Sequence, residues 1–379
     1  MKIKFTLISL IVLLFAISSQ KSVAQTAESY YNQGLNYYHL GNYESAITAY
    51  TSAIQLNPKY EDAYFNRSLA YYYQGKYESA IEDDNTAIRL DPKDAGAYYN
   101  RGLAFRQQGN YASAISDYTS AIKIKPSYAN AYYCRGLAYY YQEKYYLAIT
   151  DYDSSLVYNS NDADAYYNRG IIYRKLAKYD LAVADYNKVL AIDPNYADAY
   201  YSRGLAYYYQ NKYSSAIKDY TSSLEIKPQS AATYYNRGLA YYGQSNYDAA
   251  IDDYSKAISI DPEYANAYYN RGLSYYYKGN YDQSIDDFTS ELKISPQDAD
   301  AYLSRGLAYR KQGNYASAIT DYTLALAINP KYALAYSDRG TAYYYQGNKD
   351  ACIADWKKAV DLGDTTAKQN LKDFYSIDY

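Results

Sequence analysis

The sequence predicts an all-α fold, a solenoid of tandem helix-turn-helix repeats, from its period, its proline positions and its composition. Glycine, replaced once by serine, recurs at one fixed spacing, at positions 34, 68, 102, 136, 170, 204, 238, 272, 306 and 340. All eight prolines fall at one place in this period. The 379 residues include 63 tyrosines but only one histidine and one tryptophan. A strict period with so skewed a composition indicates one structural template copied many times.

One period, residues 95–128, shows how two helices arise. Residues at helical spacing are Tyr98, Gly102 and Phe105 in the first half, and Tyr111, Ala114, Ile115, Tyr118 and Ile122 in the second. The pair Gly109-Asn110 between the halves suits the left-handed residue that ends a helix. Lys125-Pro126 ends the second helix, because the residue before a proline is pushed away from helical backbone angles. Gly102 and Ala114 are small because the two helices approach closely there.

The 34-residue register continues without insertion through ten repeats, within residues 25–366. The ranges of repeats one to ten are 27–60, 61–94, 95–128, 129–162, 163–196, 197–230, 231–264, 265–298, 299–332 and 333–366. Residues 367–379 follow, with Leu371 and Phe374 on one helical face. We expect this last segment to be a helix and tail that cap the end of the stack.

The repeat resembles the tetratricopeptide repeat family. Tyr98, Gly102, Phe105, Ala114, Tyr118, Ala121 and Pro126 match the family's aromatic, glycine, aromatic, alanine, aromatic, alanine and proline at matching spacing. The resemblance covers about 340 residues and implies a right-handed superhelical α-solenoid. Local departures include Asp84 in place of the second-helix aromatic of repeat two, and Ala177 in place of the turn glycine of repeat five.

One departure from the family is systematic, because arginine stands where the family usually has leucine before the glycine. Nine repeats carry this arginine together with an aspartate at one fixed place in the second half of the repeat: Arg67 and Asp83, Arg101 and Asp117, Arg135 and Asp151, Arg169 and Asp185, Arg203 and Asp219, Arg237 and Asp253, Arg271 and Asp287, Arg305 and Asp321, and Arg339 and Asp355. Repeat one has neither, with Gln33 and Ala49 at these places. Joint presence and joint absence predict a structural ion pair between the two helices of a repeat.

The resemblance also implies that the first helices line a concave groove where ligands lie. Even-numbered repeats carry three consecutive tyrosines there, at 71–73, 139–141, 207–209, 275–277 and 343–345, whereas three odd-numbered repeats have Arg106, Arg174 or Arg310 at the middle place. The full period is therefore a double one that comprises two repeats. The candidate partner-binding residues are Tyr72, Tyr73, Tyr99, Arg106, Tyr133, Tyr140, Tyr141, Arg174, Tyr201, Tyr208, Tyr209, Tyr269, Tyr276, Tyr277 and Arg310.

Two interpretations of the double period are open, and they are compatible. It can record duplication of a two-repeat unit whose tyrosines pack against the tyrosines of a neighbour. It can also produce a groove striped with aromatic faces and cations for an extended ligand, since tyrosine supplies rigid contact area and arginine supplies charge-assisted contacts.

The amino terminus is predicted to be a signal peptide, residues 1–24. A basic start, residues 1–4, precedes an uncharged apolar run from Phe5 to Ile17, and Ser22-Val23-Ala24 offers small residues for cleavage before Gln25. The apolar run is short for a membrane span, although an uncleaved anchor is the alternative. We therefore expect a periplasmic, cell-envelope or secreted protein.

Charge and residue types argue against several functions. Removal of residues 1–24 leaves 35 basic and 41 acidic residues, a net charge of −6, which disfavours a general electrostatic grip on nucleic acid. The sole histidine, His39, has no serine or cysteine motif around it and no second histidine for a metal. Cys134 and Cys352 lie in distant repeats and are expected to be unpaired structural thiols. We expect no enzyme activity, catalytic residue, cofactor or metal.

Two functions follow from these observations. The leading hypothesis is a non-catalytic scaffold of the cell envelope or exterior that binds an extended peptide or protein partner in the tyrosine-rich concave groove. The alternative is a glycan-binding solenoid, because tyrosine faces stack on sugar rings. Competition by soluble envelope glycans against protein partners distinguishes the two.

Overall fold

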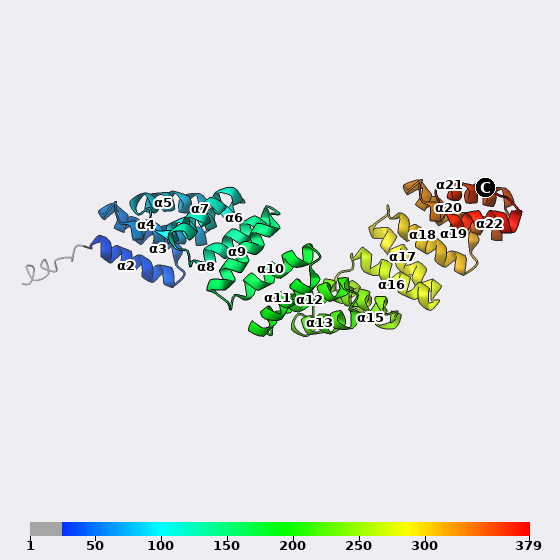
Figure 1. Ribbon diagram of the computed structural model, residues 1–379, viewed down its shortest axis with the longest axis horizontal. Helices are drawn as coiled ribbons and strands as arrows, with labels where there is room; N and C mark the ends of the chain where they lie inside the picture. Colours follow the sequence, from blue (N-terminus) through cyan, green and yellow to red (C-terminus); the bar gives the residue numbers. More distant parts are fainter. Residues whose placement is uncertain (1–24) are drawn as a thin grey trace, which may run out of the picture. The chain divides into compact units, whose positions relative to one another are not determined.

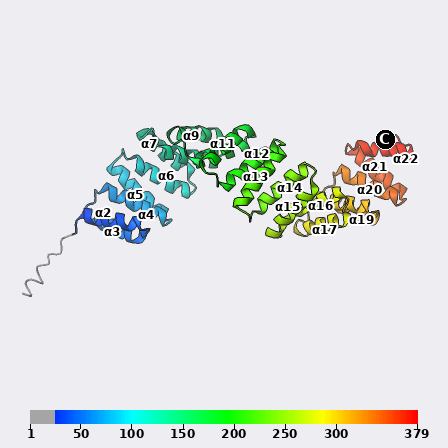
Figure 2. The same ribbon diagram turned by 90° about the horizontal axis from the view of Figure 1, so that it is seen from below.

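The computed structural model describes residues 25–379, and the predicted signal peptide, residues 1–24, lies outside the described residues. These described residues form 21 α-helices and no strand, so the predicted all-α fold is confirmed. The chain divides into two compact units, one ending at Ile172 and the other beginning at Tyr173. Within each unit, a helix packs against the helix before it and the helix after it (Figures 1 and 2). No helix in residues 25–379 is both long enough and apolar enough to cross a membrane.

The helices follow the 34-residue period. The first unit contains α2 (Ala27–His39), α3 (Tyr43–Leu56), α4 (Glu61–Tyr73), α5 (Tyr77–Leu90), α6 (Ala95–Gln107), α7 (Tyr111–Ile124), α8 (Ala129–Tyr141), α9 (Tyr145–Tyr158) and most of α10 (Ala163–Lys175). The second contains α11 (Tyr179–Ile192), α12 (Ala197–Tyr209), α13 (Tyr213–Ile226), α14 (Ala231–Gly243), α15 (Tyr247–Ile260), α16 (Ala265–Lys278), α17 (Tyr281–Ile294), α18 (Ala299–Lys311), α19 (Tyr315–Ile328), α20 (Ala333–Tyr345), α21 (Lys349–Asp361) and α22 (Thr365–Tyr375).

The turn between the two helices of a repeat is a left-handed cap. Gly109 has φ of +74°, and the Asn110 N–H donates to the Phe105 carbonyl at 2.9 Å, which closes α6 in the usual glycine-terminated way. The Asn110 side chain then accepts from the Ser113 N–H at 3.1 Å and caps α7. All ten turns have positive φ at this position, with glycine in six; the exceptions are Glu143, Ala177, Asn211 and Ser245.

A glycine and an aromatic ring set the distance between the two helices. A Cβ added to Gly102 would lie 2.7 Å from Cε1 of the fully buried Tyr118, so only glycine fits without movement of the ring. This contact differs in repeat two, where Ser68 replaces the glycine and Asp84 replaces the aromatic residue. The Ser68 hydroxyl donates to Oδ1 of Asp84 at 2.6 Å, and burial raises the pKa of Asp84 well above its ordinary value.

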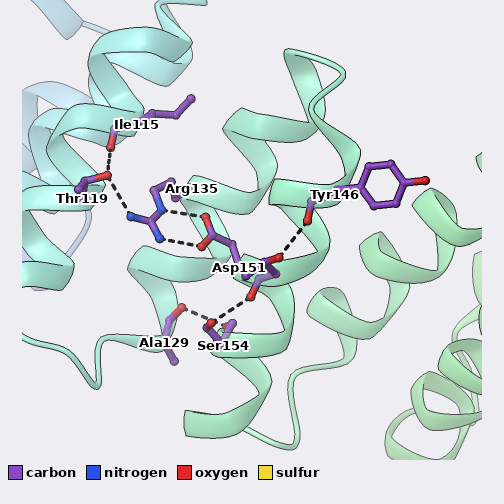
Figure 3. A network of polar contacts seen from close by, with 9 residues as sticks. Ile115, Thr119, Ala129, Arg135, Tyr146, Asp151 and Ser154 are labelled. Atoms are coloured by element: carbon purple, nitrogen blue, oxygen red, sulfur yellow. Dashed lines mark hydrogen bonds and ion pairs between the residues drawn. The ribbon is translucent and has the colours of Figure 1, made fainter.

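The predicted arginine–aspartate ion pairs are confirmed. In repeat four, Nε and Nη2 of Arg135 donate to the two carboxylate oxygens of Asp151 at 2.8 and 2.7 Å (Figure 3). The pairs that lie within one compact unit all form, at 2.6–2.8 Å: Arg67–Asp83, Arg101–Asp117, Arg135–Asp151, Arg203–Asp219, Arg237–Asp253, Arg271–Asp287, Arg305–Asp321 and Arg339–Asp355. We call this set the arginine–aspartate ladder. The aspartates are buried, so the ladder belongs to the interior of the repeats.

Each ladder arginine also joins its repeat to the one before. Nη1 of Arg135 donates to the hydroxyl of Thr119 on α7 at 3.0 Å (Figure 3). The guanidinium also lies 5.6 Å from the ring centre of Tyr132. One guanidinium therefore connects three helices. In repeat one, Gln33 stands at this place and donates from Nε2 to the Tyr37 hydroxyl of its own helix at 3.4 Å.

Candidate functional site

Four candidate tyrosines near the starts of first helices connect neighbouring repeats. Tyr99, Tyr133, Tyr201 and Tyr269 are half-buried. The Nδ2 groups of Asn168 and Asn236 donate to the hydroxyls of Tyr133 and Tyr201 at 3.1 and 3.2 Å, and the hydroxyls of Tyr99 and Tyr269 lie 3.6 and 3.3 Å from Cys134 Sγ and Ser304 Oγ. Each partner lies in the next repeat along the chain. This contribution to packing was not foreseen, because the 34-residue comparison aligns equivalent residues and does not show which residues meet across repeats.

The third tyrosine of each even-repeat triplet is exposed but held in place. The relative exposures of Tyr73, Tyr141, Tyr209 and Tyr277 are 54–57%. Each ring stacks on the tyrosine that begins the second helix of the preceding repeat. The stacked pairs are Tyr43–Tyr73, Tyr111–Tyr141, Tyr179–Tyr209, Tyr247–Tyr277 and Tyr315–Tyr345, with ring centroids 5.2–5.7 Å apart and interplanar angles of 10–13°. We call these pairs the tyrosine stacks.

The tyrosine stacks give the double period a structural basis. The tyrosines pack against those of a neighbour, as the duplication interpretation expects, and they also remain exposed, as a binding surface requires. The first partner of each stack was missed in the sequence. Its signal was present, because tyrosine begins the second helix of repeats one to nine.

The middle tyrosine of each triplet contacts the ring of the exposed third tyrosine. Tyr72, Tyr140, Tyr208 and Tyr276 are half-buried. The ring of Tyr276 meets that of Tyr277 nearly at right angles, with 5.6 Å between the centroids, and Tyr208 meets Tyr209 in the same edge-to-face manner. Middle and third tyrosines are therefore brought together on the surface of the first helices.

The three candidate arginines occupy the place of the middle tyrosine but differ in their partners. Arg310 forms an ion pair with Asp338 of the next repeat at 3.2 Å. Burial raises the pKa of Asp338 to about 6, although Arg310 acts in the opposite direction. Within residues 25–379, Arg106 and Arg174 have no ion pair, and the Nε of each is buried without a hydrogen bond.

A hollow lies between the first helices of repeats eight and nine. Its volume is about 50 Å³, and its lining residues are Leu273, Tyr276, Tyr277, Phe288, Ser304 and Leu307. Two candidate residues, Tyr276 and Tyr277, therefore border a recess with largely apolar walls. Phe288 stands where repeat six has Tyr220, so the phenol hydroxyl of the usual tyrosine is missing beneath this recess.

Comparisons with protein families give a consistent result. A family model described as “TPR repeat” matches residues 34–72, 69–107, 102–142, 136–176 and 204–245. Models described as “Tetratricopeptide repeat” match residues 163–196, 231–264, 269–333 and 185–218. Together these matches extend over residues 34–264 and 269–333. No curated protein matches the sequence.

Several solved structures are similar over part of this chain. The crystal structure of MamA protein is 31% identical, with a TM-score of 0.43, and the match covers 45% of this chain and 94% of that one. YrrB, described as a TPR protein with an unusual peptide-binding site, is 25% identical, with a TM-score of 0.46 and coverage of 49% and 96%. Yeast Tom70 is 16% identical, with a TM-score of 0.41 and coverage of 90% and 93%.

Proposed function

This chain belongs to the tetratricopeptide repeat family, and we propose that it is a non-catalytic scaffold that binds an extended peptide or protein partner. The binding surface is formed by the first helices and carries the tyrosine stacks, the middle tyrosines that support them, and the recess at Phe288. Partners of this chemistry lie across several repeats and place apolar side chains against the rings.

The observation that carries this proposal is the combination of exposure and fixation in the tyrosine stacks. Tyr209 and Tyr277 expose more than half of their surface, yet each is stacked on one ring and met edge-on by another. Binding to side chains that are already held loses little conformational entropy. Tyrosine in addition offers a large contact area with a hydroxyl for hydrogen bonding. Such a surface supports binding.

Peptide display tests the proposal directly. Residues 25–379 are immobilised, random dodecapeptides are selected, and the affinity of the selected peptides is measured by fluorescence anisotropy. The double variant Tyr209→Ala/Tyr277→Ala is expected to weaken binding about tenfold or more, because two rigid aromatic contacts are lost.

The matched control removes two exposed tyrosines from α9, the second helix of repeat four. Tyr146 and Tyr158 have relative exposures of 66% and 50%, and Tyr146→Ala/Tyr158→Ala is expected to leave the affinity unchanged. Equal losses in the two double variants, or a selection that returns no binding peptide, would show that this surface does not bind extended peptides.

The exposed rings also favour the alternative of a glycan ligand. A partly exposed tyrosine ring can stack on a sugar as well as on a peptide side chain. In the same anisotropy assay, soluble envelope polysaccharide that displaces the selected peptides, and that loses this effect with Tyr209→Ala/Tyr277→Ala, would favour glycan binding.

The proposed location is the periplasm, the cell envelope or the exterior. The support is the pattern of residues 1–24, with its basic start, its apolar run and the small residues before Gln25. Mass spectrometry of the protein from envelope and culture-medium fractions tests it. The expected amino terminus is Gln25, and recovery of the intact chain from the cytoplasmic fraction would exclude export.

A further inference from the structure

Two arginines at the same place in the repeat have opposite surroundings. Arg310 is neutralised by Asp338 at 3.2 Å. Arg106 has Cys134 where Arg310 has Asp338, and a buried thiol supplies no negative charge that balances a guanidinium. Arg106 and Arg310 occupy equivalent positions in repeats three and nine, so their surroundings can be compared directly.

Arg106 lies in a half-buried environment without any carboxylate partner among residues 25–379. Its Nε is buried and makes no hydrogen bond, and the fully buried hydroxyl of neighbouring Tyr118 also lacks one within the described chain. Arginine keeps its proton in proteins, so the half-buried guanidinium stays charged. Burial, followed by smaller contributions that include Asp164 and Asp162, raises the pKa of the neighbouring Tyr133.

The other half-buried arginines to compare with Arg106 are those of the arginine–aspartate ladder. Each ladder arginine within a compact unit has a bidentate aspartate, because a guanidinium withdrawn from water loses solvation that a carboxylate must replace. Arg106 lacks that compensation within its own chain.

We propose that Arg106 forms an anionic subsite of the first-helix surface, where it receives a carboxylate side chain of the bound peptide. This subsite rests on the proposed function and specifies the partner as acidic at one position. The planar guanidinium can donate two parallel hydrogen bonds to a carboxylate. The nearby Tyr72 hydroxyl accepts from Nε2 of Gln107 at 2.9 Å, which leaves its own proton for the same carboxylate.

Nuclear magnetic resonance of the Arg106 Nε–H group tests the subsite without a known partner. The chain 25–379 is titrated with glutarate, with the neutral isostere glutaramide and with inorganic phosphate, and the resonance is assigned from its absence in Arg106→Gln. Glutarate is expected to shift it saturably and glutaramide to leave it in place. Equal responses to glutarate and glutaramide, or none to glutarate, would overturn the proposal. A stronger response to phosphate would replace the carboxylate by a phosphate group.

A gain of binding at Arg310 provides the second arm. In the wild-type chain the Arg310 Nε–H resonance is expected not to shift when glutarate is added, because the guanidinium is already paired with Asp338. In Asp338→Asn the arginine loses its partner, and the resonance is expected to respond as that of Arg106 does. An unresponsive Arg310 in this variant would show that lack of a carboxylate does not create an anion site here.

Peptide pairs separate this inference from the proposed function. Acetylated and amidated peptides from the display selection are made in pairs that differ only by Glu or Gln at one position. The wild-type chain is expected to prefer one Glu peptide about tenfold, and Arg106→Gln to remove the preference. Tight binding without any Glu preference would overturn the subsite and leave the scaffold intact. Loss of all peptide binding would overturn the scaffold, and the glutarate titration would still decide on Arg106.

Discussion

Repeats six and eight have the same helices and the same ladder but different interiors. The pairs α12–α13 and α16–α17 carry the ion pairs Arg203–Asp219 and Arg271–Asp287, both at 2.7 Å. Inside repeat eight, Phe288 replaces tyrosine, Ser284 replaces alanine and Glu291 replaces serine. Glu291 is only 2% exposed, and one of its carboxylate oxygens has no hydrogen bond within residues 25–379.

The comparison of repeats six and eight shows which contacts the repeats share and which contacts vary. The arginine connects three helices in both repeats, so we expect replacement of its aspartate to be costly in both. The interior beneath the first helix can change, and the recess lies where it has changed. We therefore expect repeat eight to be less stable than repeat six, at the recess of the proposed binding surface.

Removal of the ladder carboxylate is expected to have the largest effect, and an equal one in both repeats. Asp219→Asn and Asp287→Asn each leave a half-buried guanidinium without its counterion, which we expect to cost about 3 kcal/mol. Hydrogen exchange of α12–α13 and α16–α17 measures this as the free energy of local opening, since repeats open locally. The control Asp248→Asn breaks an exposed ion pair with Lys278 and should cost less than about 0.5 kcal/mol. A cost as small as the control in either repeat would mean that the ladder is not the common framework.

Replacement of the buried glutamate is expected to make repeat eight more stable. Burial, and then the nearby Asp298, raise the pKa of Glu291 from 4.5 to about 7. Below pH 4.5 the carboxyl is protonated in both the folded and the unfolded chain, so it does not oppose folding. As the pH rises to about 7 the unfolded chain releases its proton more readily, and stability falls.

Glu291→Ala removes this pH dependence and restores the alanine of other repeats. We expect a gain of about 2 kcal/mol in the opening free energy of α17 at pH 8, and little gain at pH 4. Ser223→Ala in repeat six is the matched control and should be insensitive to pH. The same gain at both pH values would show that packing, rather than ionisation, distinguishes the interiors.

The turns of the two repeats allow a smaller test. Gly279 has φ of +82°, and a Cβ there would meet nothing within 4 Å, so Gly279→Ala introduces backbone strain alone. We expect it to cost about 1 kcal/mol. Asn211 occupies the same place with φ of +58°, and Asn211→Gly is expected to stabilise repeat six by about 0.5 kcal/mol. Thermal melting of both variants checks the opposite signs, and shifts in one direction would show that the turn backbone is not what differs.

Much of this fold could be predicted from the sequence because the same residue pattern occurs in ten repeats. The Gly–Tyr contact, the left-handed turn and the Arg–Asp pair each follow from residue types at fixed spacing. The paired substitution of Ser68 and Asp84 was harder to foresee, because each looked like an isolated departure. Only the structure shows that they are hydrogen-bonded to each other in place of the glycine–ring contact.

The candidate site was less predictable because its contacts cross between repeats. The sequence predicted both Tyr277 and Tyr133 to be partner-binding residues. Tyr277 is exposed in a tyrosine stack, whereas the hydroxyl of Tyr133 accepts a hydrogen bond from the next repeat. The charge balance around each arginine depended on a single residue of the following repeat. Sequence periodicity identifies equivalent positions, but it does not give the distance between neighbouring helices on which these contacts depend.

The smallest expected change in stability comes from one hydroxyl group. Phe288→Tyr places a hydroxyl in the recess bordered by Leu273 and Tyr276, and it should alter stability by less than about 1 kcal/mol, because the corresponding hydroxyl of Tyr220 is buried without a hydrogen bond in the described chain. Peptide affinity in the anisotropy assay is expected to fall about threefold, since the space for an apolar side chain is filled. The reciprocal change, Tyr220→Phe, should keep or slightly raise stability, because it removes an unbonded buried hydroxyl. If Phe288→Tyr left the affinity of every selected peptide unchanged, the altered interior of repeat eight would have no part in binding, and the contrast with repeat six would be one of stability alone.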